Sequence, residues 1–296
     1  MLDANHGLLV LDAALPNPGL QGTYDRVVHG LALDLASSTM FVTDGSGLFS
    51  ALDVSGLPPT LAGSIRLGRY GQAVAVYGGH AYVATEDAGI LVLDVGNPAS
   101  PVEAHTNTWA HAASDLAVSG THLYVADGPA GLKILSLASP AAPAPVGQLQ
   151  LAAAAVQACA ESNTAYVVAG EGGLRIFDIT DVTTPTFLGS CACVSNGCGV
   201  AVSAGMVAVA DGQFGVKLVD VTAPASPPPL GVYTGLPFAA CVATHGTMVL
   251  ACHGTDVHLI DASSPAAPAL LDTWSAPAFV HALALSSSRA GVAMGN

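Results

Sequence analysis

The chain has 296 residues, only 9% of them charged, and its 7 basic and 21 acidic residues leave a formal net charge of −14. So few lysines and arginines exclude a general nucleic-acid-binding protein, because the neutralisation of phosphates needs many of them. A hydrophobic fraction of 51% excludes intrinsic disorder, and no apolar run reaches the roughly 18 residues of a membrane-spanning helix.

The N-terminal residues and the cysteines do not identify the cellular compartment of the protein. Residues 1–6 contain no basic region and no long apolar stretch, so we expect no signal peptide here. Six cysteines are too few for a disulfide-rich scaffold, although their even number permits up to three bridges.

A short apolar phrase that ends in aspartate recurs along the whole chain, beginning with residues 7–12. Successive copies are 41 or 42 residues apart, and they end at Asp12, Asp53, Asp94, Ser136, Asp178, Asp220 and Asp261. A fixed period of about 42 residues is typical of repeat architectures. We therefore expect a single repeat domain over residues 1–296.

Each repeat has the same internal order, which the fourth copy shows clearly. An alternating run at residues 115–118 leads through a turn to a second run at 123–126. Asp127-Gly128 then forms a turn before residues 133–135, and a proline-rich connection precedes a last run at 146–149. Short runs bounded by glycine, proline and aspartate predict strands. Residues 151–160 are rich in alanine, but they fall where the other repeats place a loop and a first strand.

Four strands in about 42 residues correspond to one propeller blade, so we expect an all-β, seven-bladed β-propeller with four-stranded antiparallel blades. Sheets stacked between neighbours are apolar on both faces, which explains the scarcity of charge. The last repeat supplies only two strands, whereas the first begins at its third strand. The N-terminal strands should therefore close the last blade with the C-terminal strands, from residues 281–296 plus 6–28.

The repeated phrase resembles the LVIVD-repeat family of bacterial and archaeal surface proteins. The best copies are residues 124–128 with 131–134 (YVADG and GLKI) and residues 173–179 (GLRIFDI). The resemblance covers essentially the whole chain and implies an exported β-propeller without catalytic residues. The chain departs from the pattern at Ser136, and again at residues 252–254, where Cys-His-Gly replaces Ala-Asp-Gly.

In a propeller, the loops that enter the first strands surround one mouth of the central channel. A pocket with convergent polar groups and aromatic walls is the default ligand site. The candidate ligand-binding residues at this mouth are Arg26, His29, Arg69, Tyr70, Gln72, Trp109, His111, Asp115, Gln157, Trp274 and His281. The alternative is a water-filled funnel that binds no specific ligand.

Charged and metal-ligating residues admit further interpretations, each with a structural alternative. His29 and His281 occupy matching positions, but a zinc site needs three or four ligands, so we expect no metal and no cofactor. The Asp-Gly pairs could be calcium loops, but each turn offers one carboxylate where calcium needs six to eight oxygens, so hairpin turn chemistry is the favoured explanation. Lys133, Arg175 and Lys217 recur every 42 residues, either as an anion-binding ladder or as solubilising charges.

The cysteines cluster in the last third of the chain. Cys191, Cys193 and Cys198 could form a disulfide in the loop before the next blade. Cys241 and Cys252 flank a hairpin at positions that would face each other, where a bridge is geometrically possible. Buried free thiols are the alternative. The possible disulfide residues are thus Cys191, Cys198, Cys241 and Cys252.

No catalytic elbow, phosphate loop or metalloprotease motif occurs in the sequence, so we name no catalytic residue. We expect a non-catalytic extracellular or cell-surface module that binds protein partners or copies of itself. The alternatives are a hydrolase- or lyase-like enzyme, or a sugar-binding propeller that uses Tyr70, Trp109 and Trp274 as stacking platforms.

Overall fold

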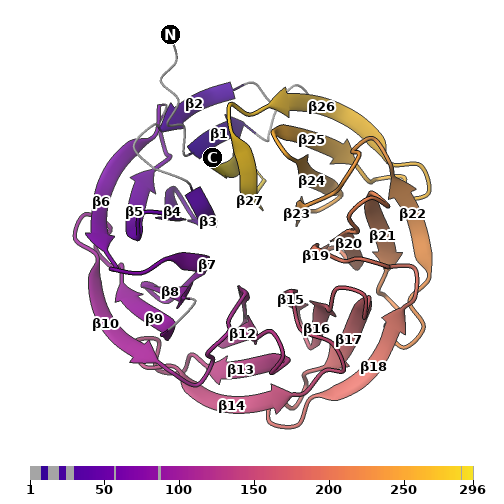
Figure 1. Ribbon diagram of the computed structural model, residues 1–296, viewed down its shortest axis with the longest axis horizontal. Helices are drawn as coiled ribbons and strands as arrows, with labels where there is room; N and C mark the ends of the chain where they lie inside the picture. The colour runs from indigo at the N-terminus through magenta and orange to yellow at the C-terminus, as the bar shows by residue number, and fades with distance from the viewer. Residues whose placement is uncertain are drawn as a thin grey trace.

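The computed structural model describes residues 8–12, 20–24, 30–56, 58–85, 88–287 and 289–295. Within these residues every regular element is a β-strand. The described strands form seven four-stranded antiparallel sheets, arranged radially around a central opening (Figure 1). The expected β-propeller with four-stranded antiparallel blades is confirmed.

Six of the sheets are blades built from four consecutive strands. The first two blades are β3 (Gly30–Ala36), β4 (Thr39–Asp44), β5 (Leu48–Asp53) and β6 (Thr60–Arg66), then β7 (Gly71–Tyr77), β8 (His80–Thr85), β9 (Gly89–Asp94) and β10 (Val102–Asn107). The next two are β11 (Asp115–Ser119), β12 (His122–Ala126), β13 (Leu132–Ser136) and β14 (Ala144–Leu149), then β15 (Gln157–Glu161), β16 (Thr164–Val168), β17 (Leu174–Asp178) and β18 (Thr186–Cys191). The last two are β19 (Gly199–Ser203), β20 (Met206–Ala210), β21 (Val216–Asp220) and β22 (Pro229–Tyr233), then β23 (Cys241–His245), β24 (Met248–His253), β25 (Asp256–Asp261) and β26 (Ala269–Ser275).

The remaining sheet, here called the closing sheet, combines both ends of the chain. Its order is β2 (Leu20–Tyr24), β1 (Leu8–Asp12), β28 (Arg289–Gly295) and β27 (Phe279–Leu285). In the antiparallel pairing of β1 with β28, Leu8 lies opposite Ala293. The N-terminal strands thus pair with the C-terminal strands, as the incomplete first and last repeats predict.

Apolar side chains fill the spaces between neighbouring sheets. For example, Tyr166 and Ile176 of one blade pack with Val200 and Val207 of the next. The closing sheet packs in the same way on both sides, against Leu250 and its neighbours through β28 and against Met40 and its neighbours through Leu8 and Val10. Burial of apolar surface at about 25 cal/mol per Å² is the main stabilising contribution of such contacts.

Strand direction gives the disc two different faces. The first strand of each blade begins at the face that carries the loops between blades and the turns between second and third strands. We call this face the mouth face. The opposite face carries the hairpins between first and second strands and the proline-rich loops after the third strands, and we call it the base face. Figure 1 shows the first strands around the opening and the fourth strands on the rim.

The aspartates that end the repeated phrase open the loops of the base face. Their carboxylates accept a hydrogen bond from the main-chain N–H two residues later, as in Asp178 with Thr180 at 2.8 Å and Asp220 with Thr222 at 2.9 Å. Asp53, Asp94 and Asp261 do the same. These turns give the aspartates that end the repeated phrase a structural role.

Candidate functional site

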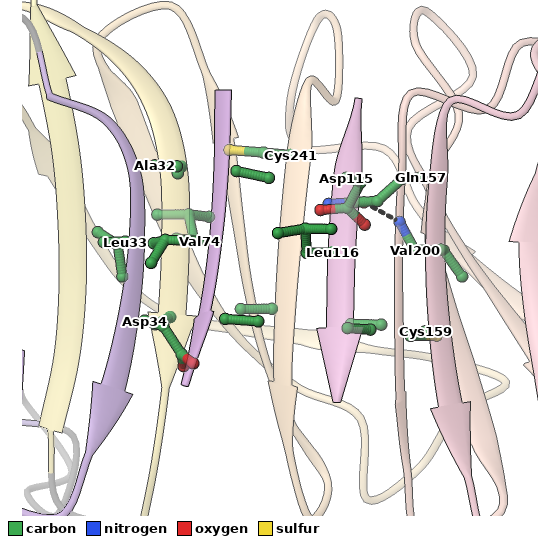
Figure 2. A pocket seen from close by; sticks show the side chains of 18 of the residues that line it. Ala32, Leu33, Asp34, Val74, Asp115, Leu116, Gln157, Cys159, Val200 and Cys241 are labelled. Carbon is green, nitrogen blue, oxygen red and sulfur yellow. Dashed lines mark hydrogen bonds between the residues drawn. The ribbon is translucent and has the colours of Figure 1, made fainter. Parts of the chain in front are cut away.

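The inner strands line a cavity of about 800 Å³ along the propeller axis, which is shown from close by in Figure 2. Its wall is made largely of alanine, valine and leucine side chains. The polar and sulfur-containing wall residues are Asp34, Gln72, Ser114, Asp115, Gln157, Cys159, Cys198, Cys241, Thr244 and His281. The described wall contains no lysine or arginine.

Several wall side chains bind the main chain of the neighbouring blade. The innermost strand of each blade has a free edge, so its N–H groups need partners from outside its own sheet. The donor and acceptor pairs are Val76 N–H with Asp34 at 2.8 Å, Ala158 N–H with Asp115 at 3.0 Å, and Val200 N–H with Gln157 at 2.5 Å. Figure 2 shows the bond from Val200 to Gln157. These side chains therefore fasten adjacent blades at the channel wall.

Burial changes the acidity of the channel groups. It raises the pKa of Asp115 to about 7, against the opposing effect of the Ala158 N–H. It also raises the pKa of Asp34, in spite of hydrogen bonds from Val76 and Leu35. Burial and the nearby charge of Asp115 raise the pKa of the Cys159 thiol well above its usual value. This thiol is thus held protonated, which does not suit a nucleophile.

The predicted mouth residues divide into two groups. Gln72, Asp115, Gln157 and His281 are brought together on the cavity wall. Outside that wall lie Arg69 and Tyr70 between β6 and β7, Trp109 and His111 between β10 and β11, and Trp274 within β26 rather than in a loop. Arg26 and His29 lie outside the described residues. The proposed aromatic platforms Tyr70, Trp109 and Trp274 therefore do not share the channel.

Sequence reasoning missed Asp34 and Cys159 as channel residues. Both lie within alternating apolar strands, at positions whose side chains face the axis. Their place in the alternation of β3 and β15 is the signal that could have found them.

The interpretation of Lys133 as a solubilising charge is wrong. Its side chain is only 8% exposed, and its ammonium group lies 2.5 Å from the Asp127 carboxylate and 2.5 Å from the Trp109 carbonyl oxygen. The ammonium also lies 5.0 Å from the centre of the Trp109 ring. Lys133 thus fastens the turn between β12 and β13 to the loop that enters β11.

The Asp-Gly turns use their carboxylates within the protein. Asp44 accepts bonds from the N–H groups of Ser46 and Leu48, and Asp211 accepts bonds from those of Ser195 and Asn196. These contacts support the turn interpretation over the calcium one. Among the described residues, no three His, Cys, Asp or Glu side chains are grouped as metal ligands.

Two disulfides are formed, Cys191–Cys193 and Cys241–Cys252. The bridge between the facing positions of β23 and β24 agrees with the expected geometry. The expectation that Cys198 forms a bridge is wrong, since its thiol is free and contacts the Asn196 carbonyl oxygen at 3.3 Å. The physical reason is the chain reversal after β18, which places Cys193 with its Cα 5.2 Å from that of Cys191.

The mouth face around the channel exposes large apolar side chains. Tyr70 is 55% exposed, Phe214 is 41% exposed and Phe279 is 58% exposed. The loops that carry such residues are tied between blades, for example through the paired main chains of Gly212 and Ala239. The mouth face is therefore a rigid surface with separated aromatic groups.

No helix in the described part of the chain has the length and apolarity needed to cross a membrane. None of the curated proteins matches the chain in sequence.

Solved structures show the same fold at low sequence identity. The chain is similar to the WD40 repeats of RRP9, with a TM-score of 0.74 and 14% identity over 97% of each chain. It is also similar to BamB from Moraxella catarrhalis, with a TM-score of 0.60 and 14% identity over 99% of this chain and 91% of that one. The computationally designed Ika8 protein gives a TM-score of 0.66 and 12% identity, over 90% and 96%.

The family comparison is more specific. The LVIVD repeat matches residues 68–108, 110–150, 160–193 and 196–234, which together make up more than half of the chain. The first, second and fourth of these segments each contain all four strands of one blade. The chain therefore belongs to the LVIVD-repeat family.

Proposed function

We propose that this protein is a non-catalytic module that binds protein partners through its mouth face. The observation that carries the proposal is the set of exposed aromatic side chains, Tyr70, Phe214 and Phe279, on loops held by hydrogen bonds between blades. Aromatic residues on a rigid surface lose little conformational freedom on binding and are enriched at the centres of protein interfaces.

The channel groups support a structural role over a catalytic one. The carboxylates of Asp34 and Asp115 and the amide of Gln157 accept bonds from the neighbouring blade, and the Cys159 thiol is held protonated. Polar groups engaged in this way hold neighbouring blades together.

We place the module outside the cytosol. The two disulfides support this setting, because disulfides persist mainly in oxidising compartments. The measurement is the mass of the protein isolated from its source, after alkylation with and without reductant. Four oxidised cysteines are expected, whereas six free thiols would contradict the placement.

We also propose that the closing sheet acts as a seventh blade of a permanently closed ring. Its packing against both neighbouring blades supports this interpretation. Closure leaves no terminal blade face exposed to solvent, which gives the mouth face its rigidity.

The binding function is tested by comparing two triple variants in quantitative pull-downs from extracts of the source cells. The mouth variant carries Tyr70→Ser, Phe214→Ser and Phe279→Ser. The matched rim variant carries Leu61→Ser, Phe187→Ser and Leu271→Ser, which change apolar groups on outer strands that are also exposed. We expect the mouth variant to recover at least tenfold less of the specific partners than the wild type, and the rim variant to recover the same amount. Equal recovery by the two variants would overturn the proposal.

A further inference from the structure

In two neighbouring blades, the third strand carries a basic residue near one end and an acidic residue at the other. In β17, Arg175 lies near the mouth face and Asp178 ends the strand at the base face. In β21, Lys217 and Asp220 occupy the same two positions. Each of these strands is thus positive toward the mouth face and negative toward the base face.

The base face is rich in carboxylates. Its strand-end aspartates are Asp53, Asp94, Asp178, Asp220 and Asp261. Hydrogen bonds from Thr180 and Thr222, first from their side chains and then from their main chains, lower the pKa values of Asp178 and Asp220. Among the described residues, the cation at this face is Arg289, whose guanidinium lies 3.5 Å from the Val54 carbonyl oxygen.

The mouth face holds most of the described basic residues, which are Arg66, Arg69, Lys133, Arg175 and Lys217. Lys133 is neutralised by Asp127. Of the described carboxylates of this face, those of Asp44, Asp127 and Asp211 are buried in turns, and Asp115 begins strand β11 at the channel wall. Glu171 is exposed and Asp256 is half-buried. The base face of the disc therefore carries more negative charge than the mouth face, and in the sector of β17 and β21 Arg175 and Lys217 share the mouth side with Glu171 and Asp211.

The propeller geometry makes the two charged rings match. Figure 1 shows that the third strands β5, β9, β13, β17, β21 and β25 lie at similar distances from the axis. The strand-end carboxylates and the mouth-side cations therefore lie on circles of similar radius. In a second copy stacked along the axis in the same orientation, the strand-end carboxylates would face these cations, and the proline- and alanine-rich loops would face the mouth loops that carry Tyr70, Phe214 and Phe279.

We propose that the partner of the mouth face is the base face of a second copy of this chain, in a head-to-tail column. This inference rests on the proposed binding function of the mouth face and names its partner. A head-to-tail contact uses two different surfaces and does not close, so it continues from copy to copy. The column is stabilised by charge pairs at the radius of the third strands and by apolar contacts of the mouth loops.

The first experiment is sedimentation velocity on the purified protein over a concentration series at about 50 mM and about 500 mM salt, because screening weakens charge pairs between exposed groups. We expect sedimentation coefficients that rise with concentration at low salt, and association at least tenfold weaker at high salt. A protein that stays monomeric in both buffers up to the highest soluble concentration would overturn the proposal.

The second experiment reverses each face separately. The mouth-reversed variant carries Arg175→Glu and Lys217→Glu. The base-reversed variant carries Asp178→Asn and Asp220→Asn, which keep the turn acceptor, together with Ala138→Lys and Ala223→Lys in exposed positions of the base loops. We expect each variant alone to be monomeric and an equimolar mixture to recover association, since each variant then supplies the face that the other needs.

Controls separate folding from docking. A rim variant, Glu103→Lys with Asp272→Lys, changes charge on outer strands and should associate like the wild type. Melting temperatures identify a variant that fails to fold. If the mouth-reversed variant fails to fold, the double variant Arg175→Ala with Lys217→Ala is used in its place. A mixture that does not recover association contradicts the column. If the purified protein is monomeric while pull-downs still depend on the mouth aromatics, the column is wrong and the binding function stands.

Discussion

At the scale of single residues, the channel wall shows how a propeller satisfies its inner edges. Asp115 and Gln157 occupy corresponding positions in adjacent blades, and each accepts a hydrogen bond from the main chain of the following blade. Gln157 does this as a neutral amide. A carboxyl at the corresponding position needs no charge for the same bond, which agrees with the raised pKa of Asp115.

This shift predicts a pH dependence of stability. Burial raises the pKa of Asp115 from 3.8 to about 7, so between these values the native state holds a proton that the unfolded state has released. The contribution of Asp115 to the free energy of unfolding therefore falls as the pH rises from about 4 to about 7. Asp115→Asn keeps the acceptor but does not titrate. We expect the melting temperature of this variant, relative to wild type, to rise across that window, as measured by differential scanning fluorimetry. Parallel curves for the two proteins would contradict the assignment.

The ion pair of Lys133 with Asp127 predicts an asymmetric mutational effect. Lys133→Met leaves the buried Asp127 carboxylate without its cation, and breaking a buried pair costs about 3–5 kcal/mol. Arg175→Met is the matched control, because Ala169 stands where the corresponding blade would need an aspartate. We expect the control to stay within about 0.5 kcal/mol of wild type in urea unfolding. Similar losses in both variants would show that Lys133 acts through packing alone.

At the scale of elements, four outer strands, β6, β14, β18 and β22, each receive a loop of the next blade at a glycine. An ideal Cβ at Gly147 of β14 would lie 1.8 Å from the Val182 carbonyl oxygen, and one at Gly189 of β18 would lie 2.5 Å from that of Pro224. Gly63 and Gly231 meet the following loops at similarly short distances. Glycine at this position lets the proline-rich loops lie against the rim strands.

Gly147→Ala should therefore destabilise the protein, because backbone atoms of the 182 loop cannot move aside like a flexible side chain. Overpacking of this kind costs about 1–3 kcal/mol. Gly56→Ala is the control, since nothing lies within 4 Å of its ideal Cβ and its φ is not positive. The free energy of unfolding in urea measures both. A loss no larger at residue 147 than at residue 56 would mean that the loop contact is dispensable.

The repeat spacing was sufficient to predict the strands, because alternation and turn residues encode both the strand and its position in a blade. The Asx turns at Asp178 and Asp220 could be predicted for the same reason. The bridge from Cys191 to Cys193 could not be predicted, because Cys198 is also near in sequence. The chain reversal after β18 determines which of the two cysteines lies next to Cys191. The inter-blade role of Asp34 was missed because its partner is a main-chain N–H 42 residues away.

At the scale of the whole molecule, closure makes stability a property of the ring. In an open array of repeats each unit contacts only its neighbours, and the terminal units unfold first. Here β1 pairs with β28, and the closing sheet buries Leu8 and Val10 against the first blade. If the closing sheet acts as a blade, its loss exposes two blade faces at once and weakens the entire ring.

Val10→Asp tests this closure, because it places a carboxylate at a fully buried position of β1. We expect a loss of at least about 3 kcal/mol in urea unfolding, as is typical for an unpaired buried charge. Val102→Asp is the matched control, since Val102 is 50% exposed on β10. Hydrogen exchange then locates the effect. A closed ring predicts faster exchange in β13 and β17, across the disc from the substitution, together with β28. Faster exchange confined to β1, β2 and β28 would instead describe six blades with a detachable closing sheet.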